Sequence, residues 1–164
     1  MGCSQAQLGD YQGAIADYDQ AIALKSKDSD VYNNRGWYRF LSNNNQGALA
    51  DWELAMALNP NNSYVYSNRG FYQVILGNNQ RGLVDIEKSI QLNPELANSY
   101  AIRGLIRTNS DDRAGAVSDY KQALKINPKL IDDLTKDAKQ LQRSNNLTSY
   151  QKYQQIIQDL TVKK

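Results

Sequence analysis

The sequence predicts an all-α protein built as an array of helical hairpins, because one residue pattern recurs every 34 residues. Gly2, Gly36, Gly70 and Gly104 are equally spaced, and the three prolines of the chain, Pro60, Pro94 and Pro128, have the same spacing. A further small-residue series in phase is Ala14, Ala48, Gly82 and Ala116. A fixed period of this length is typical of supersecondary units that stack on their neighbours.

Each repeat is expected to contain two antiparallel helices. Small residues such as Gly36 and Ala48 mark the crossing, where two helix axes approach to roughly 8–10 Å. Each Asn-Pro pair ends the second helix, because proline lacks the amide that the helix needs and restrains the residue before it. The pattern predicts helix pairs over 30–42 and 45–58, 64–76 and 79–92, and 98–109 and 112–126.

The two ends of the chain depart from this pattern. Gly2 already occupies the eighth place of a repeat, which predicts a truncated first helix up to residue 8 and a second helix over 10–24. After Pro128 the glycines and prolines stop, but apolar residues keep helical spacing, which predicts a degenerate capping hairpin. The single array 1–164 then divides into a truncated repeat 1–28, full repeats 29–62, 63–96 and 97–130, and the cap 131–164.

Composition excludes several classes of enzyme. The chain has no histidine and one cysteine, so a histidine-based triad, a Cys-His dyad, a Cys/His zinc site and an intrachain disulfide are excluded. The paired carboxylates Asp111–Asp112 and Asp132–Asp133 lie at predicted helix starts, where the helix dipole favours acidic residues. Adjacent helical residues also point in different directions. We expect no enzymatic activity, no metal and no cofactor.

Charge and hydropathy limit the partners. No run of about 18 apolar residues and no signal-peptide pattern occur, so we expect a cytoplasmic protein without a membrane span. The net charge is +2, with 4 basic and 7 acidic side chains in 1–62 but 7 basic and 4 acidic in 129–164. This gradient lacks the dense basic stripe of a phosphate-backbone binder, so RNA or DNA is the weaker alternative as a partner.

The pattern resembles the tetratricopeptide repeat, a helical hairpin with small residues where its helices touch. With repeats counted from Ser29, Ser63 and Ala97, the small residues of the family at the eighth place fall on Gly36, Gly70 and Gly104. Its closing proline falls on Pro60, Pro94 and Pro128, and the resemblance covers residues 1–128 directly. The resemblance implies a right-handed superhelical solenoid in which the first helices line a concave groove.

Two charged series accompany the repeat. Arginine recurs at the seventh place and aspartate at the twenty-third, so an arginine of one helix can pair in bidentate fashion with an aspartate of the other. Because every unit carries the pair, we interpret it as structural. The residues of these structural ion pairs are Arg35, Arg69 and Arg103 with Asp17, Asp51, Asp85 and Asp119.

The remaining candidates form a stripe on the predicted first helices, opposite the second helices. Amides there can donate to and accept from an extended peptide backbone, and aromatic rings can take its side chains. The alternative is that Trp37, Phe71 and Leu41 are core residues and only the amides are exposed. The candidate binding residues are Asn33, Asn34, Trp37, Leu41, Tyr64, Ser67, Asn68, Phe71, Asn98 and Leu105.

The sequence therefore predicts a non-catalytic protein-protein interaction module that binds an extended peptide or partner segment in its concave groove. The first seven places of the first repeat are missing, so the apolar face of helix 10–24 lacks a cover. We expect either a fragment of a longer array or a different surface over that face. The alternatives for function are a self-assembling scaffold, with a homo-oligomer formed through this N-terminal face, and an adaptor segment of a larger protein.

Overall fold

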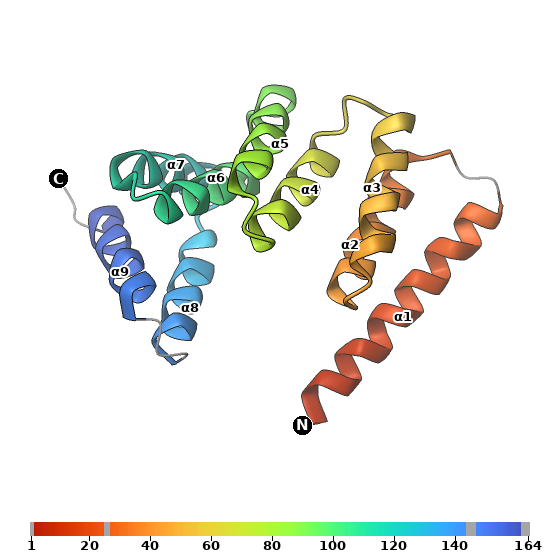
Figure 1. The fold of residues 1–164 in the computed structure, drawn as a ribbon, viewed down its shortest axis with the longest axis horizontal. Helices are drawn as coiled ribbons and strands as arrows, with labels where there is room; N and C mark the ends of the chain where they lie inside the picture. Colours follow the sequence, from red (N-terminus) through yellow and green to blue (C-terminus); the bar gives the residue numbers. More distant parts are fainter. Residues whose placement is uncertain (1, 25–26, 144–146, 162–164) are drawn as a thin grey trace.

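The computed structural model describes residues 2–24, 27–143 and 147–161, and within them the chain forms nine helices and no strand (Figure 1). The helices are α1 (Gly2–Ala23), α2 (Ser29–Leu41), α3 (Asn45–Leu58), α4 (Ser63–Ile75), α5 (Asn79–Leu92), α6 (Ala97–Asn109), α7 (Arg113–Ile126), α8 (Leu130–Arg143) and α9 (Leu147–Thr161). They follow one another along the long axis of the molecule as successive hairpins (Figure 1). The all-α prediction is confirmed.

The three central hairpins, α2–α3, α4–α5 and α6–α7, begin and end within one residue of the predicted positions. Within each hairpin, the turn contains one residue in the left-handed conformation: Asn43 (φ 64°), Gly77 (φ 79°) and Asp111 (φ 61°). Glycine, asparagine and aspartate tolerate this conformation best, so these residue types fix the turn. The second helices end at Asn59, Asn93 and Asn127, whose extended backbone precedes the prolines.

The core lies where the two helices of each hairpin cross. Ala48, Trp52 and Ala55 of α3 are fully buried, and so are Ala116, Tyr120 and Ala123 at the same repeat places of α7. Residues four and three positions apart lie on one face of a helix, so these triplets form the face that packs on the first helix. Ile86 fills the equivalent position in the middle hairpin with no exposed surface. Packing of a small, a large and a small residue thus repeats along the array.

The first predicted hairpin does not form. Residues 2–8 and 10–24 were expected as separate helices, but α1 is one continuous helix over Gly2–Ala23. Gly9 occupies the place that takes the left-handed conformation in the other turns. A helix that continues through Gly9 keeps the backbone hydrogen bonds that a turn would break, and only packing between two helices could offset that loss.

The helix α1 packs on α2 through both aromatic and charged contacts. The ring of Tyr18 stacks on that of Tyr38 with centroids 5.9 Å apart, and Asp19 pairs with Arg35 at 2.6 Å. Ala14, Tyr18 and Ala21 are only half-buried, although the residues at the same places of α3 and α7 are fully buried. The face of α1 that would meet a first helix is therefore incompletely covered.

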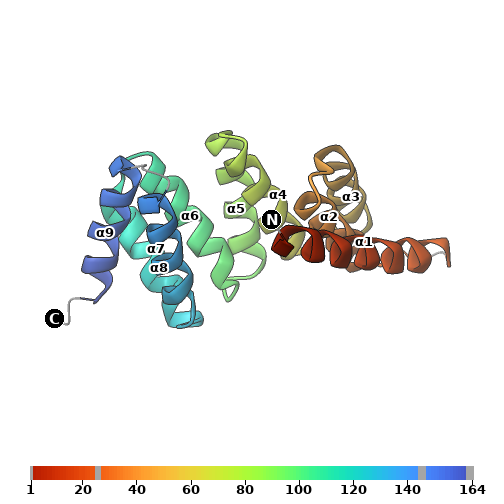
Figure 2. The same ribbon diagram turned by 90° about the horizontal axis from the view of Figure 1, so that it is seen from below.

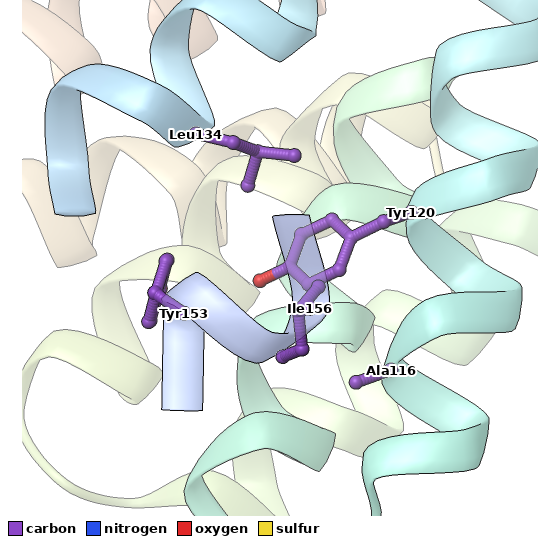
Figure 3. Close-up of a cluster of buried hydrophobic side chains, with 5 residues drawn as sticks. All are labelled: Ala116, Tyr120, Leu134, Tyr153 and Ile156. Atoms are coloured by element: carbon purple, nitrogen blue, oxygen red, sulfur yellow. The ribbon is translucent and has the colours of Figure 1, made fainter. Parts of the chain in front are cut away.

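The last hairpin, α8–α9, is confirmed as a pair of packed helices but departs from the regular stacking. The helix α7 packs more extensively on α9 than on α8. Tyr153 and Ile156 of α9 join Ala116, Tyr120 and Leu134 in one buried cluster (Figure 3). In Figure 1, α8 extends away from the row of hairpins that precedes it, and in Figure 2, seen from below, it lies in front of α7. Because α8 packs only partly on α7, space remains between α8 and the preceding hairpin.

Candidate binding groove

A cavity of about 210 Å³ lies across the first helices of the three central hairpins. Trp37 comes from α2, Phe71 from α4, and Ala101 and Ile102 from α6, and these four side chains form its apolar part. Ser67, Asn68 and Asn98 complete its lining with polar atoms. Five of the predicted binding residues, Trp37, Ser67, Asn68, Phe71 and Asn98, thus line one cavity.

Aromatic packing fixes the apolar part of this cavity. The ring of Trp37 lies 6.1 Å from that of Phe71 and 5.5 Å from that of Phe40, measured between centroids, in the tilted arrangement that aromatic pairs favour. Both Trp37 and Phe71 are half-buried. They therefore combine the two roles that the sequence left as alternatives, since each packs between neighbouring first helices and also presents a surface to the cavity.

A hydrogen bond to the buried side chain of Asn33 orients the amide of Asn68. The Nδ2 atom of Asn68 donates to Oδ1 of Asn33 at 3.0 Å. Asn33 itself is only 4% exposed and is not among the residues that line the cavity, so its place is that of a positioning residue. The Oδ1 atom of Asn68, and both Oδ1 and Nδ2 of the exposed Asn98, can form hydrogen bonds with a peptide backbone lying in the cavity.

Ser67 is also more buried than a contact residue requires. It is 4% exposed, and its hydroxyl accepts a hydrogen bond from Oγ of Ser99 at 3.3 Å. Ser99 is joined in turn to Ser89 by a hydrogen bond of 2.7 Å. Ser67 therefore belongs mainly to a buried hydroxyl chain between hairpins, which holds α4 and α6 in register beneath the cavity.

Besides Asn33 and Leu105, three predicted binding residues lie outside the cavity. Asn34 is exposed on α2, Tyr64 is 54% exposed near the start of α4, and Leu41 is half-buried at the end of α2. None of them is among the lining residues described for the cavity. The expected stripe is thus divided: Leu41 and Tyr64 lie near helix ends, whereas Asn34 lies in the middle of α2, in register with Asn68, but outside the cavity.

Leu105 lines a second cavity, of about 130 Å³, which adjoins the first. Phe71, Ala101 and Ile102 line both cavities, so one continuous surface joins them. The second cavity extends between α6, α7 and α8. It occupies the space left where α8 does not close fully on the preceding hairpin.

The charged series forms ion pairs between the helices of each central hairpin. Arg69 donates to the two carboxylate oxygens of Asp85 at 2.8 and 2.7 Å, and Arg103 does the same to Asp119 at 2.9 and 2.6 Å. Arg35 pairs with Asp51 in the same way. Hydrogen bonds that each arginine donates to its aspartate raise the pKa of the arginine, so the guanidinium groups stay charged. Their position between helices indicates a structural role.

Asp17 does not take its predicted place in this series. It lies exposed on α1, and the carboxylate that reaches Arg35 from that helix belongs to Asp19. The repeat of Asp17 contains no arginine at the seventh place with which it could pair. The prediction for Asp17 is therefore wrong, although the same place is correctly assigned in the three full repeats.

Two arginines missed by the sequence reasoning join the ion pairs. Arg39 binds Asp51 at 2.9 Å and Arg107 binds Asp119 at 2.8 Å. Both stand at the eleventh place of their repeats, one helical turn after the first arginine, while Gln73 stands there in the middle repeat. That spacing of four residues was the available signal, because it places both arginines on one helix face.

The described part of the chain contains neither a helix that could cross a membrane nor a cluster of metal-binding side chains. Its helices include none that is long and apolar enough to cross a membrane. The same residues contain no group of three or more cysteine or acidic side chains that could hold a metal ion.

The repeated hairpins, the small residues at their crossings and the interhelical ion pairs define a helical-repeat protein. Comparison with family models identifies the repeat: residues 4–37 match a model described as TPR repeat, and residues 97–130 match one described as tetratricopeptide repeat. The chain therefore contains tetratricopeptide repeats. The second match coincides with the predicted repeat 97–130, and modules of this family generally mediate protein-protein interactions.

Solved structures share the fold. MamA is 16% identical with a TM-score of 0.65, and the match covers 98% of this chain and 92% of MamA. The type IV pilus biogenesis factor PilW is 16% identical with a TM-score of 0.72, covering 99% of this chain and 76% of PilW. YrrB, described as a TPR protein with an unusual peptide-binding site, is 17% identical with a TM-score of 0.60, covering 95% and 80%. A search of curated proteins found no match.

Proposed function

We propose that this chain is a non-catalytic interaction module that binds an extended peptide segment of a protein partner across α2, α4 and α6. The observation that carries the proposal is the cavity in which Trp37 and Phe71 lie beside the amides of Asn68 and Asn98. Each of the three hairpins contributes to it through its first helix. The peptide-binding site named for YrrB, a protein of similar fold, agrees with this proposal.

The chemistry of the cavity suits a peptide in extended conformation. Such a peptide has unpaired backbone amides and carbonyls, and asparagine side chains can both donate to and accept from them. The apolar lining can bury one side chain of the peptide, and burial of apolar surface is the main favourable term in most protein associations. Since Asn68 is oriented by Asn33 before any ligand arrives, little side-chain entropy is lost on binding.

Selection from a displayed library of random linear peptides tests the proposal. Immobilised wild-type protein is expected to enrich peptides whose affinity falls about tenfold or more in the variant Asn68→Ala/Asn98→Ala, because removal of central interface contacts has effects of this size. The control is Asn61→Ala, an exposed asparagine in the connection between α3 and α4. Circular dichroism establishes that the variants retain their helices.

Two outcomes oppose the proposal. Either the wild-type protein enriches no peptide, or the enriched peptides bind the Asn68→Ala/Asn98→Ala variant as well as they bind the wild type. Trp37→Ala is a second test of the apolar part, and its stability is measured in parallel because Trp37 is half-buried. Peptides indifferent to all three substitutions would place binding elsewhere on the molecule.

Self-association is a second candidate, supported by the half-buried face of α1. Ala14, Tyr18 and Ala21 occupy places that are fully buried in α3 and α7. Sedimentation of the wild type is expected to show mass that rises with concentration, and Ala14→Arg is expected to abolish the rise. The matched control is Ala16→Arg, on the exposed side of the same helix. A monomer at every concentration contradicts this candidate.

A further inference from the structure

The second cavity has the size and lining of a pocket for one apolar side chain. Its volume is about 130 Å³, close to the roughly 150 Å³ of an engineered apolar cavity that binds benzene. Tyr120, Ala123 and Leu134 in its walls are at most 7% exposed, so these walls belong to the packed core. Figure 3 shows the ring of Tyr120 between Leu134 and Ile156, which fixes one side of the pocket. A leucine-sized or phenylalanine-sized side chain matches this space.

The pocket opens toward the candidate groove, because Phe71, Ala101 and Ile102 line both cavities. A peptide lying along the groove therefore has a path over these three side chains to the second cavity, which we call the C-terminal pocket. The pocket exists because α7 packs more extensively on α9 than on α8, so α8 leaves space beside α6. It is thus a feature of the irregular last hairpin rather than of the regular repeat.

One carboxylate stands at this pocket. Among the described residues that line the two cavities, Asp133 is the single charged one. It is exposed on α8, and no ion pair joins it to another described residue. Its neighbour Asp132 does not line the pocket and lies with Thr135, Lys136 and Lys139 on another face of α8. Of the two adjacent aspartates, therefore, Asp133 lines the pocket and Asp132 does not.

We infer that the C-terminal pocket takes a large apolar side chain of the bound peptide, and that Asp133 pairs with a lysine or arginine next to that side chain. The inference rests on the proposed function, since the same peptide occupies the groove. Burial of the apolar side chain supplies affinity, and the carboxylate selects the charge beside it. The partner segment is accordingly a peptide that contains a leucine, isoleucine or phenylalanine adjacent to a basic residue.

The same library of random linear peptides tests this inference. Selection on the wild type is expected to enrich an apolar residue with lysine or arginine one or two positions away. Selection on Asp133→Asn is expected to keep the apolar residue and lose the basic preference. One selected peptide is synthesised in two forms, with its basic residue and with glutamine in that place. Asp133→Asn is expected to lower the affinity for the basic form about two- to fivefold, the range for exposed ion pairs.

Two further variants make the test specific. Asp132→Asn is the matched control and is expected to leave affinity unchanged. Leu124→Trp places a larger side chain in the wall of the pocket and is expected to lower affinity more than tenfold. Because Asp133 is exposed, its variant retains the fold even if Leu124→Trp does not. The effect of Asp133→Asn is also expected to shrink at high salt.

The failures of the two proposals are distinguishable. If enriched peptides need Asn68 and Asn98 but are indifferent to Leu124→Trp and Asp133→Asn, the groove function stands and the pocket assignment is wrong. The same holds if Asp132→Asn and Asp133→Asn weaken binding equally, because a general charge effect would explain that result. If the wild type enriches no peptide, the groove function and the pocket assignment both fail.

Discussion

Trp52 lies against Gly36 so closely that a Cβ atom on this glycine would stand 2.9 Å from Nε1 of the indole ring. Trp52 has no exposed surface, so its ring cannot move aside into solvent. The pair joins α2 to α3 at their crossing, where close approach of two backbones needs a residue without a side chain. The repeat of glycine at this place therefore has a direct steric cause.

Substitution of this glycine is expected to destabilise the fold despite the better helix propensity of alanine. Gly36→Ala should lower the free energy of unfolding by about 1–3 kcal/mol, as overpacking in a core does. Gly13→Ala is the control, because nothing lies within 4 Å of a Cβ atom there, and it should stabilise α1 by roughly 0.5–1 kcal/mol. Urea denaturation measures both, and a stabilising Gly36→Ala would contradict the steric explanation.

The ion pair between Arg69 and Asp85 gives a second prediction. Asp85 is 6% exposed, so Arg69→Met leaves a buried carboxylate without its main partner and should cost about 2–3 kcal/mol. The double variant Arg69→Met/Asp85→Leu removes the charge as well and should be more stable than the single one. A double-mutant cycle in urea gives the coupling. If the cost of the double variant equalled the sum of the costs of Arg69→Met and Asp85→Leu measured singly, the pair would not be coupled.

Asn62 provides a third prediction, because its side chain has two structural roles. Its Oδ1 atom accepts from the backbone amide of Tyr64 at the start of α4, and its Nδ2 atom donates to Ser29 Oγ at 2.9 Å and to Asp30. Asn62→Ala should therefore cost about 2 kcal/mol, from a lost helix cap and lost buried hydrogen bonds.

The control for Asn62→Ala is the equivalent change at the start of α5. Asn78 is exposed and makes no side-chain capping hydrogen bond, so Asn78→Ala should change the free energy of unfolding by no more than about 0.5 kcal/mol. Thermal or urea denaturation compares the two variants. Similar losses for both would mean that the hydrogen bonds of Asn62 contribute little.

The sequence was sufficient to predict the regular part of the array, because each signal there is local or repeats in phase. Every full unit repeats the helix crossing seen at Gly36 and the ion pair seen between Arg69 and Asp85. Every full unit also ends its second helix before a proline, as at Pro60. The continuous helix α1 could not be predicted in this way, since Gly9 keeps the residue type of a turn while the packing partner that would favour the turn is missing.

The candidate groove was predictable in its centre but less so at its margins. Trp37, Asn68 and Phe71 lie in the middle of their helices, where the repeat alone fixes which neighbour they face. Asn33 and Asn68 have similar residue environments in the sequence, yet one is buried and orients the other. The period places Asn33 in register with the equally buried Ser67 and Asn68 in register with Asn34, but it does not show which of the two places is buried against a neighbouring hairpin.

The irregular last hairpin gives the final prediction. Two kinds of contact hold α9 on α7: the burial of Tyr153, which is 8% exposed, and exposed ion pairs such as the bidentate pair of Arg113 with Asp159 at 2.9 Å. Loss of a buried aromatic ring leaves a cavity and should cost about 3 kcal/mol for Tyr153→Ala. Exposed ion pairs are screened by water, so Arg113→Ala should cost no more than about 1 kcal/mol.

Hydrogen exchange of α9 separates these two contributions, because terminal helices of a repeat array can open without the rest. Tyr153→Ala is expected to speed exchange throughout α9 and to leave α3 and α4 protected. Arg113→Ala is expected to speed it slightly, and less so at high salt, where the wild-type ion pair is already weakened. If Arg113→Ala released α9 as fully as Tyr153→Ala, charge rather than apolar burial would hold the cap, and the pocket beside Tyr120 would depend on ionic strength.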